Sequence, residues 1–263
     1  MTQHAPEGER AGQSPPPGGL THLLVRLGHF FFKVRDGLFP AIFLVLAFGF
    51  RPALAGGDAA LDRLVDVLGL AIALAGEALR VAVLGFTPIG RGGKNRRIHA
   101  NALMQEGLFA HCRNPLYVSN VLVLLGLIVV HGSPWFYAIG IPFYLLAYLS
   151  ITLAEEDYLR SRFGQEYESF CGHVPRYWIR LRGLRETLAG MRFDWKKLVR
   201  KEYGSAFGWV SAAFLLLGWQ AVANFGLEVS RSEVMTLLVF WLPVLGAYIV
   251  ARVLKKTGRL GRE

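Results

Sequence analysis

Hydrophobic residues along the chain gather in blocks of about twenty residues, separated by polar and glycine-rich stretches. Blocks of this length fit the hydrocarbon core of a bilayer, which is about 30 Å thick. Inside lipid every backbone N–H must bond within its own segment, so each block is expected to form a helix. The sequence predicts six such helices, at residues 37–55, 64–86, 115–131, 134–153, 207–223 and 235–252.

The composition supports a membrane protein over a soluble one. Hydrophobic residues make up 53% of the 263 residues, and the mean hydropathy is +0.36. A soluble all-helical protein rarely needs apolar blocks of this length. The predicted fold class is therefore all-α, a polytopic membrane helix bundle of about six transmembrane helices.

The distribution of basic residues predicts the orientation of this bundle. Six spans place both termini on one side of the membrane. Of the 29 Lys and Arg residues, all but Arg51, Arg63, Arg80 and Arg231 fall in the tails and loops of that side. Such asymmetry places both termini in the cytoplasm. The net charge of +10 is then a topology signal and an attraction to anionic headgroups, and no separate basic domain indicates nucleic-acid binding.

Three polar stretches outside the spans have their own predicted character. Residues 1–20 are rich in Pro, Gly and polar residues and predict a disordered tail. Residues 21–36 interleave apolar and basic positions, which is typical of an amphipathic helix along the membrane interface. The loop "TPIGRGGKNRRIHANALMQEG" lacks the strand and helix context of a phosphate-binding loop, so it is predicted to be a flexible connector.

The short link "HGSPW" between the third and fourth predicted helices requires them to be antiparallel neighbours. Residues near 113–117 and near 153–157 should then meet at one depth of the membrane. In the second predicted helix, Glu77 and Arg80 lie three positions apart and can pair on one face. Whether this pair lines a substrate path stays open.

The first of the two meeting segments favours anions. Asn114 is a suitable helix N-cap and Pro115 a suitable first helical residue. A helix start beside His111 and Arg113 is a natural site for a carboxylate or a phosphate.

The second segment carries Glu155, Glu156 and Asp157 at the predicted end of the fourth helix, where the helix dipole disfavours negative charge. Either a surface pair of Glu156 with Arg160 or a bound cationic ligand would compensate it. The two segments together suit a zwitterionic, overall cationic ligand. S-adenosylmethionine fits this description, and lipid headgroups are zwitterions too.

The ordered motifs of this region resemble the isoprenylcysteine carboxyl methyltransferase and phospholipid methyltransferase superfamily of integral membrane methyltransferases. That family's pattern is R-[HN]-P-x-Y, a helical hairpin, E-E, F-G-x-E-Y and V-P-R. The matching residues, in order, are Arg113, Pro115, Tyr117, Glu155, Glu156, Phe163, Gly164, Glu166, Tyr167, Val174, Pro175 and Arg176. Asn114 stands where many members have His.

The resemblance implies a cytoplasmic site that binds S-adenosylmethionine and a lipid-like acceptor that enters from the bilayer. The acceptor would be an isoprenylcysteine-type carboxylate or a phospholipid amine. The residues expected to bind the cofactor are His111, Arg113, Asn114, Pro115, Tyr117, Glu155, Glu156 and Tyr167. The residues expected to be catalytic are Arg113, Glu156 and Arg176.

The resemblance also divides the chain into four predicted parts. These are the tail 1–20, the interfacial helix and first span 21–64, the methyltransferase-like core 65–182, and a basic linker with two additional helices, 183–263. The resemblance implies nothing about the last part, which could complete an acceptor tunnel, form an oligomer contact or bind a partner.

Two other functions remain open on sequence alone. A membrane reductase of the sterol-reductase type would share a related helical core and use NADPH, although an acid-rich helix end is unfavourable beside its phosphate. A non-enzymatic scaffold would use the polar clusters as helix caps and headgroup anchors. A metal site built from His111, Cys112, Cys171 and His173 is not predicted, because adjacent ligands point in different directions and no CxxC spacing is present.

Overall fold

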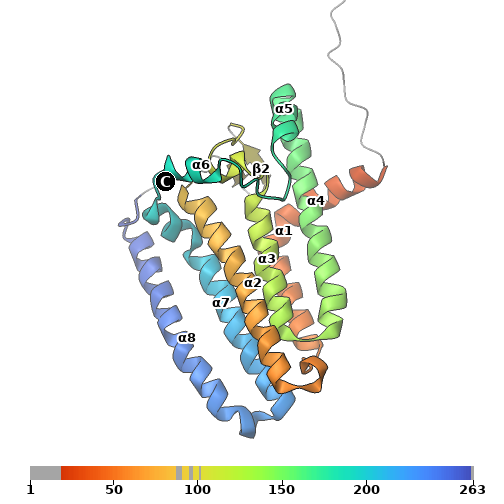
Figure 1. Ribbon diagram of the computed structural model, residues 1–263, viewed down its shortest axis with the longest axis vertical. Coiled ribbons are helices and arrows are strands. Elements are labelled where there is room, and N and C mark those ends of the chain that lie inside the picture. The colour runs from red at the N-terminus through yellow and green to blue at the C-terminus, as the bar shows by residue number, and fades with distance from the viewer. Residues whose placement is uncertain (1–18, 87–90, 95–96, 101, 262–263) are drawn as a thin grey trace, which may run out of the picture.

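The structure, a computed structural model, describes residues 19–86, 91–94, 97–100 and 102–261. Long helices lie side by side, and short elements gather at one end of them (Figure 1). The elements are α1 (Gly19–Gly49), η1 (Ala55–Gly57), α2 (Ala59–Phe86), β1 (Arg91–Lys94), β2 (Arg97–Ala100), η2 (Gly107–Ala110), α3 (Pro115–His131), α4 (Pro134–Phe163), α5 (Gln165–His173), α6 (Leu184–Ala189), α7 (Trp195–Phe225) and α8 (Leu227–Lys256). The predicted disordered tail lies almost wholly outside the described residues.

The six predicted hydrophobic blocks fall in α1, α2, α3, α4, α7 and α8. Among the described residues, four helices are long and apolar enough to cross a membrane: α2, α4, α7 and α8. The apolar helix α3 is shorter, at 17 residues. The structure therefore supports an integral membrane helix bundle, while the count of six crossings stays a prediction.

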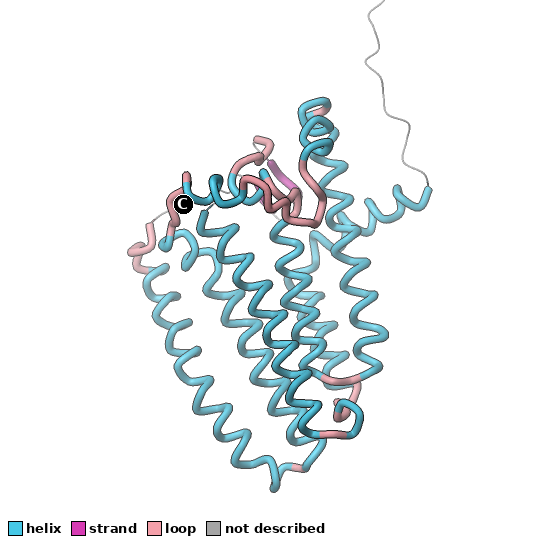
Figure 2. The backbone as a smooth tube through the Cα atoms, viewed as in Figure 1, coloured by secondary structure: helices cyan, strands magenta, loops and turns pink. Residues whose placement is uncertain are grey.

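Two details of the fold go beyond the prediction. The interfacial helix 21–36 and the first span are one continuous helix, α1, which passes through Pro40. The residue at the boundary between them that could interrupt the helix is Gly37. A single glycine destabilises a helix by about 1 kcal/mol. Packing of α1 against α4 can offset this cost. The predicted all-α class is confirmed, and β1 and β2 add one short antiparallel pair within the predicted flexible connector (Figure 2).

Glycines bring α2 and α3 into close contact. A Cβ atom at Gly76 would lie 2.8 Å from the carbonyl oxygen of Ser119, and one at Gly69 would lie 2.8 Å from that of Gly126. Small residues at such positions let two membrane helices pack backbone to backbone. This contact fixes α3, whose first residues carry the candidate site.

Replacing Gly126 with alanine is expected to destabilise the bundle by about 1–3 kcal/mol, the usual cost of overpacking. The new Cβ would collide with the Gly69 carbonyl oxygen and with Ala73 on α2. The thermal unfolding midpoint in detergent measures the effect. Gly246→Ala on α8 is the matched control, because nothing lies within 4 Å of its added Cβ. Equal midpoints for the two variants would contradict this packing.

One end of the bundle, here called the rim, carries the short elements α5, α6 and the β1–β2 hairpin (Figure 1). Both ends of the described chain lie at the rim as well. The link between α3 and α4 lies at the other end, where Gly132 takes φ 74°. The first residues of α3 therefore meet the second half of α4 near the rim, as the short link predicts.

Candidate functional site

The start of α3 is a sharp corner in the chain. Pro115 is the first helical residue and Asn114 occupies the N-cap position, as predicted. The Asn114 side chain, however, does not cap the helix. Its Nδ2 donates to Glu156 Oε1 at 3.4 Å and to the carbonyl oxygen of Arg176 at 3.3 Å. Asn114 thus links α3 to α4 and to the segment that follows α5.

Glu156 is the centre of this contact and is only 2% exposed. Arg176 binds its carboxylate with two donors, Nε at 3.0 Å and Nη2 at 2.7 Å. Arg113 Nη1 lies 3.3 Å from Glu156 Oε1. We call Arg113, Asn114, Glu156 and Arg176 the corner cluster. The structure therefore brings together the three residues predicted to be catalytic.

The corner cluster holds two guanidinium groups and one carboxylate. Burial opposes the charge of Arg176, but its hydrogen bonds and its charge attraction to Glu156, together with nearby tyrosines, raise the pKa of the guanidinium. The cluster thus brings two basic side chains to one acidic side chain. A buried ion pair of this kind is stable only when its geometry and hydrogen bonds are good, and the two-donor contact of Arg176 meets that condition.

The predicted end of the fourth helix is wrong. Neither Gly nor Pro occurs in residues 154–163, so α4 continues to Phe163. Gly164 then turns the chain into α5 with φ 49°, a conformation that glycine adopts without strain. Glu155 and Glu156 therefore lie inside the helix. The dipole at the C-terminus of α4 does not disfavour their negative charge. Arg160 pairs with Glu168, not with Glu156.

Glu155 belongs to a second polar group beside the corner cluster. The Tyr117 hydroxyl lies beside the side chains of Glu155 and of Arg35, which comes from α1. The Arg35 guanidinium also lies 5.9 Å from the centroid of the Tyr117 ring. Sequence reasoning missed Arg35, because it reads as one more basic residue of an interfacial helix and no local pattern links it to Tyr117.

His111 lies behind the corner and is 2% exposed. Its Nδ1 is 2.7 Å from the carbonyl oxygen of Arg180, and its Nε2 is 2.9 Å from Thr187 Oγ1. Because a carbonyl oxygen can only accept, Nδ1 must donate. The ring therefore ties the corner to the segment between α5 and α7, and its predicted contact with a cofactor stays a prediction.

Tyr167 is 1% exposed and packs with Leu159 and Phe170 in a small core beneath α5. Burial raises the pKa of its hydroxyl, and the nearby Glu156 carboxylate adds to the rise. Arg113 Nη1 also donates to Cys171 Sγ at 2.7 Å. Cys171 is thus a further neighbour of the corner cluster that sequence reasoning did not identify.

The V-P-R motif lies in a loop that crosses the corner (Figure 2). The backbone N–H of Arg113 donates to the carbonyl oxygen of Pro175 at 2.9 Å, and that of Arg180 donates to His111 at 3.0 Å. These bonds hold Arg176 over α4. Burial raises the pKa of the Tyr177 hydroxyl, which comes next in the loop.

An apolar cavity of about 390 Å³ opens between α3, α4 and this loop. We call it the α3–α4 groove. It is lined by Tyr117, Val118, Val121, Leu122, Leu145, Tyr148, Leu149, Tyr177 and Trp178. Tyr117 has its ring in the groove and its hydroxyl on Glu155, so the groove adjoins the polar site.

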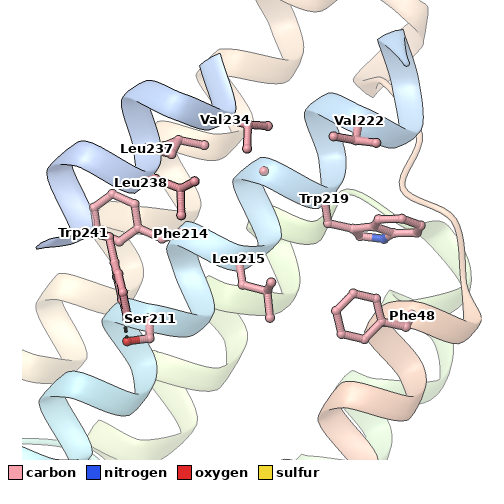
Figure 3. A pocket seen from close by; sticks show the side chains of 11 residues that line it. Phe48, Ser211, Phe214, Leu215, Trp219, Val222, Val234, Leu237, Leu238 and Trp241 are labelled. Atoms are coloured by element: carbon pink, nitrogen blue, oxygen red, sulfur yellow. Dashed lines mark hydrogen bonds between the residues drawn. The ribbon is translucent and has the colours of Figure 1, made fainter. Parts of the chain in front are cut away.

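A larger cavity, of about 490 Å³, lies between α7, α8 and the end of α1 (Figure 3). Its walls are apolar, and its one drawn hydrogen bond runs from Trp241 Nε1 to Ser211 Oγ at 3.0 Å. None of the predicted site residues lines it. The volume of a cavity alone therefore does not identify the functional site of this protein.

A comparison with models of known protein families shows which family this part of the chain is similar to. Residues 67–166 match the phospholipid methyltransferase family model. The match confirms the resemblance that the motifs carry. Neither a search of curated proteins nor a search of solved structures returned a match.

The segment that matches this family model, residues 67–166 and here called the family core, includes α3 and α4 with Arg113, Tyr117, Glu155 and Glu156. It ends before Arg176, and it includes neither α1 nor the helices α7 and α8. The match supports a membrane methyltransferase with a lipid-like substrate, and it does not favour a reductase.

Proposed function

We propose that the protein is an integral membrane, S-adenosylmethionine-dependent methyltransferase that acts on a lipid-like acceptor at the rim. The observation that carries the proposal is the corner cluster, which lies at the junction of the family core and the loop that crosses it. There a buried Glu156 holds Arg113 and Arg176 together. The polar site and an apolar groove share Tyr117.

The side chains present fit a zwitterionic cofactor with excess positive charge. Arg113 and Arg176 bring two cations against one carboxylate, which suits a ligand carboxylate. Glu155 supplies a separate, nearly buried carboxylate for an ammonium group or hydroxyls. Asn114 and Tyr117 would complete the contacts from α3. S-adenosylmethionine supplies a methyl group on a sulfonium, which is already activated for transfer.

The protein's own task is to align the acceptor and exclude water. The apolar α3–α4 groove suits the hydrocarbon part of a lipid and brings its polar end toward Tyr117. A carboxylate acceptor is already nucleophilic and needs no base. An amine acceptor must first lose a proton, and Glu155 is the better placed base. Glu156 is engaged by two arginines, and Glu166 is exposed and accepts from Gln105 at 2.9 Å.

We further propose the full topology that the charge distribution predicts. All six long helices would cross the membrane, with both termini and the rim in the cytoplasm. The basic residues of the loop between α5 and α7 would then face anionic lipid headgroups. The core would extend over residues 65–182, and α7 and α8 would form an added hairpin.

The test is transfer of labelled methyl from S-adenosylmethionine to a membrane lipid extract by the purified protein. We expect label in a lipid or in a prenylated peptide, and identification of the labelled species names the acceptor. Loss of label in Arg176→Ala at unchanged thermal stability would assign the transfer to the corner. An absence of label in both acceptor classes would contradict the proposal.

A further inference from the structure

A chain of polar contacts crosses the inside of the bundle and reaches the α3–α4 groove. Arg80 on α2 donates from Nε to Glu202 Oε2 on α7 at 2.7 Å, and from Nη1 to Asn120 Oδ1 on α3. The Asn120 side chain lies in turn beside the Tyr148 hydroxyl on α4. The predicted partner of Arg80 was Glu77, but Glu77 accepts from Trp209 Nε1, also on α7, at 3.0 Å.

Three members of this chain belong to the family core, and the fourth does not. Arg80, Asn120 and Tyr148 lie within residues 67–166, whereas Glu202 comes from the added helix α7. Glu202 is 3% exposed. The added hairpin therefore supplies Arg80 with a carboxylate inside the bundle, in addition to Glu77 on α2, which also interacts with Arg80.

A buried charge pair is an expensive way to hold two helices together, because desolvation consumes most of the attraction. Apolar contacts between α2 and α7 would do this at lower cost. The polar chain has a further effect that apolar contacts would lack. It places a polar side chain, that of Asn120, beside one hydroxyl of the groove wall, that of Tyr148.

The Tyr148 ring forms part of the groove wall. Its centroid lies 5.5 Å from that of Phe39 and 5.9 Å from that of Tyr117. The Tyr117 hydroxyl in turn lies beside Glu155. The position of the Tyr148 ring therefore sets the shape of the groove next to the polar site.

We propose that Glu202, Arg80 and Asn120 are positioning residues that hold Tyr148 as a wall of the acceptor groove. The added hairpin then determines how well the hydrocarbon part of the lipid acceptor is held. This inference rests on the proposed function. It assigns α7 a role in acceptor binding, separate from the cofactor contacts of the corner cluster.

A double-mutant cycle between Glu202→Gln and Tyr148→Phe tests the inference. The readouts are KM for the labelled lipid acceptor, kcat, and the Kd of S-adenosylmethionine. Each single change should raise the acceptor KM about fivefold to tenfold, the effect of one lost hydrogen bond. The other two readouts should stay within about twofold. The double variant should be no worse than the worse single variant, because both changes act through one contact.

Gln220→Met is the matched control. Gln220 Nε2 donates to Asp62 Oδ2 at 2.7 Å, another buried contact between α7 and α2, at the far end of the bundle. It should lower the unfolding midpoint and leave the acceptor KM unchanged. If Glu202→Gln does not yield folded protein, the charge-neutral pair Arg80→Gln with Glu202→Gln replaces it.

Two results would overturn the inference. One is an acceptor KM that Glu202→Gln leaves unchanged while stability falls, which is the behaviour of a purely structural pair. The other is a double variant whose KM effects multiply, which is the behaviour of independent residues. Failure of the proposed function has a different signature, since the wild-type protein would then neither bind S-adenosylmethionine nor transfer methyl.

Discussion

Replacing Glu156 with glutamine is expected to lower methyl transfer by about 100-fold or more. The change leaves Arg113 and Arg176 beside each other without their shared carboxylate. Removing one partner of a buried pair leaves the other charges uncompensated, and a small misplacement of binding groups can lower a reaction rate about 100-fold. The loop that carries Arg176 should also loosen, since that residue binds Glu156 with two donors. Steady-state methyl transfer and hydrogen exchange of residues 174–182 measure the two effects.

Glu168→Gln is the matched control for this variant. It removes the same charge from an exposed ion pair, that of Glu168 with Arg160. Exposed pairs contribute only about 0–1 kcal/mol, so both activity and exchange should stay close to wild type. Equal losses in the two variants would show that the buried pair has no special role.

Replacing Glu155 with glutamine is expected to weaken binding of S-adenosylmethionine about 10- to 100-fold, the range for a hydrogen bond to a charged group. Glu155 is 5% exposed. Its carboxylate lies beside the hydroxyl of Tyr117, whose ring lines the α3–α4 groove. Equilibrium dialysis with labelled cofactor measures the change.

Asp157→Asn makes the same charge change one residue further along α4. Asp157 is half-buried and lies on a different face of the helix. Cofactor affinity should be unchanged in this variant. A loss of affinity as large as that of Glu155→Gln would indicate a general charge effect of the acidic run, which would contradict a specific contact at Glu155.

Much of the bundle follows from local sequence patterns. Span-length apolar blocks predict the long helices, and the five-residue link predicts the α3–α4 hairpin. Because the link is so short, the approach of Arg113 to Glu156 could also be expected. Pro115 marks the start of α3 correctly, since its ring fits the first helical position.

Other features depend on contacts that a local pattern does not contain. The end of α4 was placed too early, because the polar run after residue 153 continues the helix until Gly164. Asn114 was expected to cap α3, but burial against Glu156 gives its side chain a stronger partner. Arg80 was paired with Glu77 by spacing, whereas the structure supplies Glu202 from α7. Partners from distant helices override local pairing in each case.

The account depends most on the claim that the corner binds S-adenosylmethionine. The direct test is equilibrium binding of S-adenosylmethionine and of NADPH to the detergent-purified wild-type protein, with Glu156→Gln and Glu168→Gln alongside. We predict saturable binding of S-adenosylmethionine to wild type and Glu168→Gln, its loss in Glu156→Gln, and no binding of NADPH. Saturable binding of NADPH, or S-adenosylmethionine binding that Glu156→Gln leaves unchanged, would contradict the account.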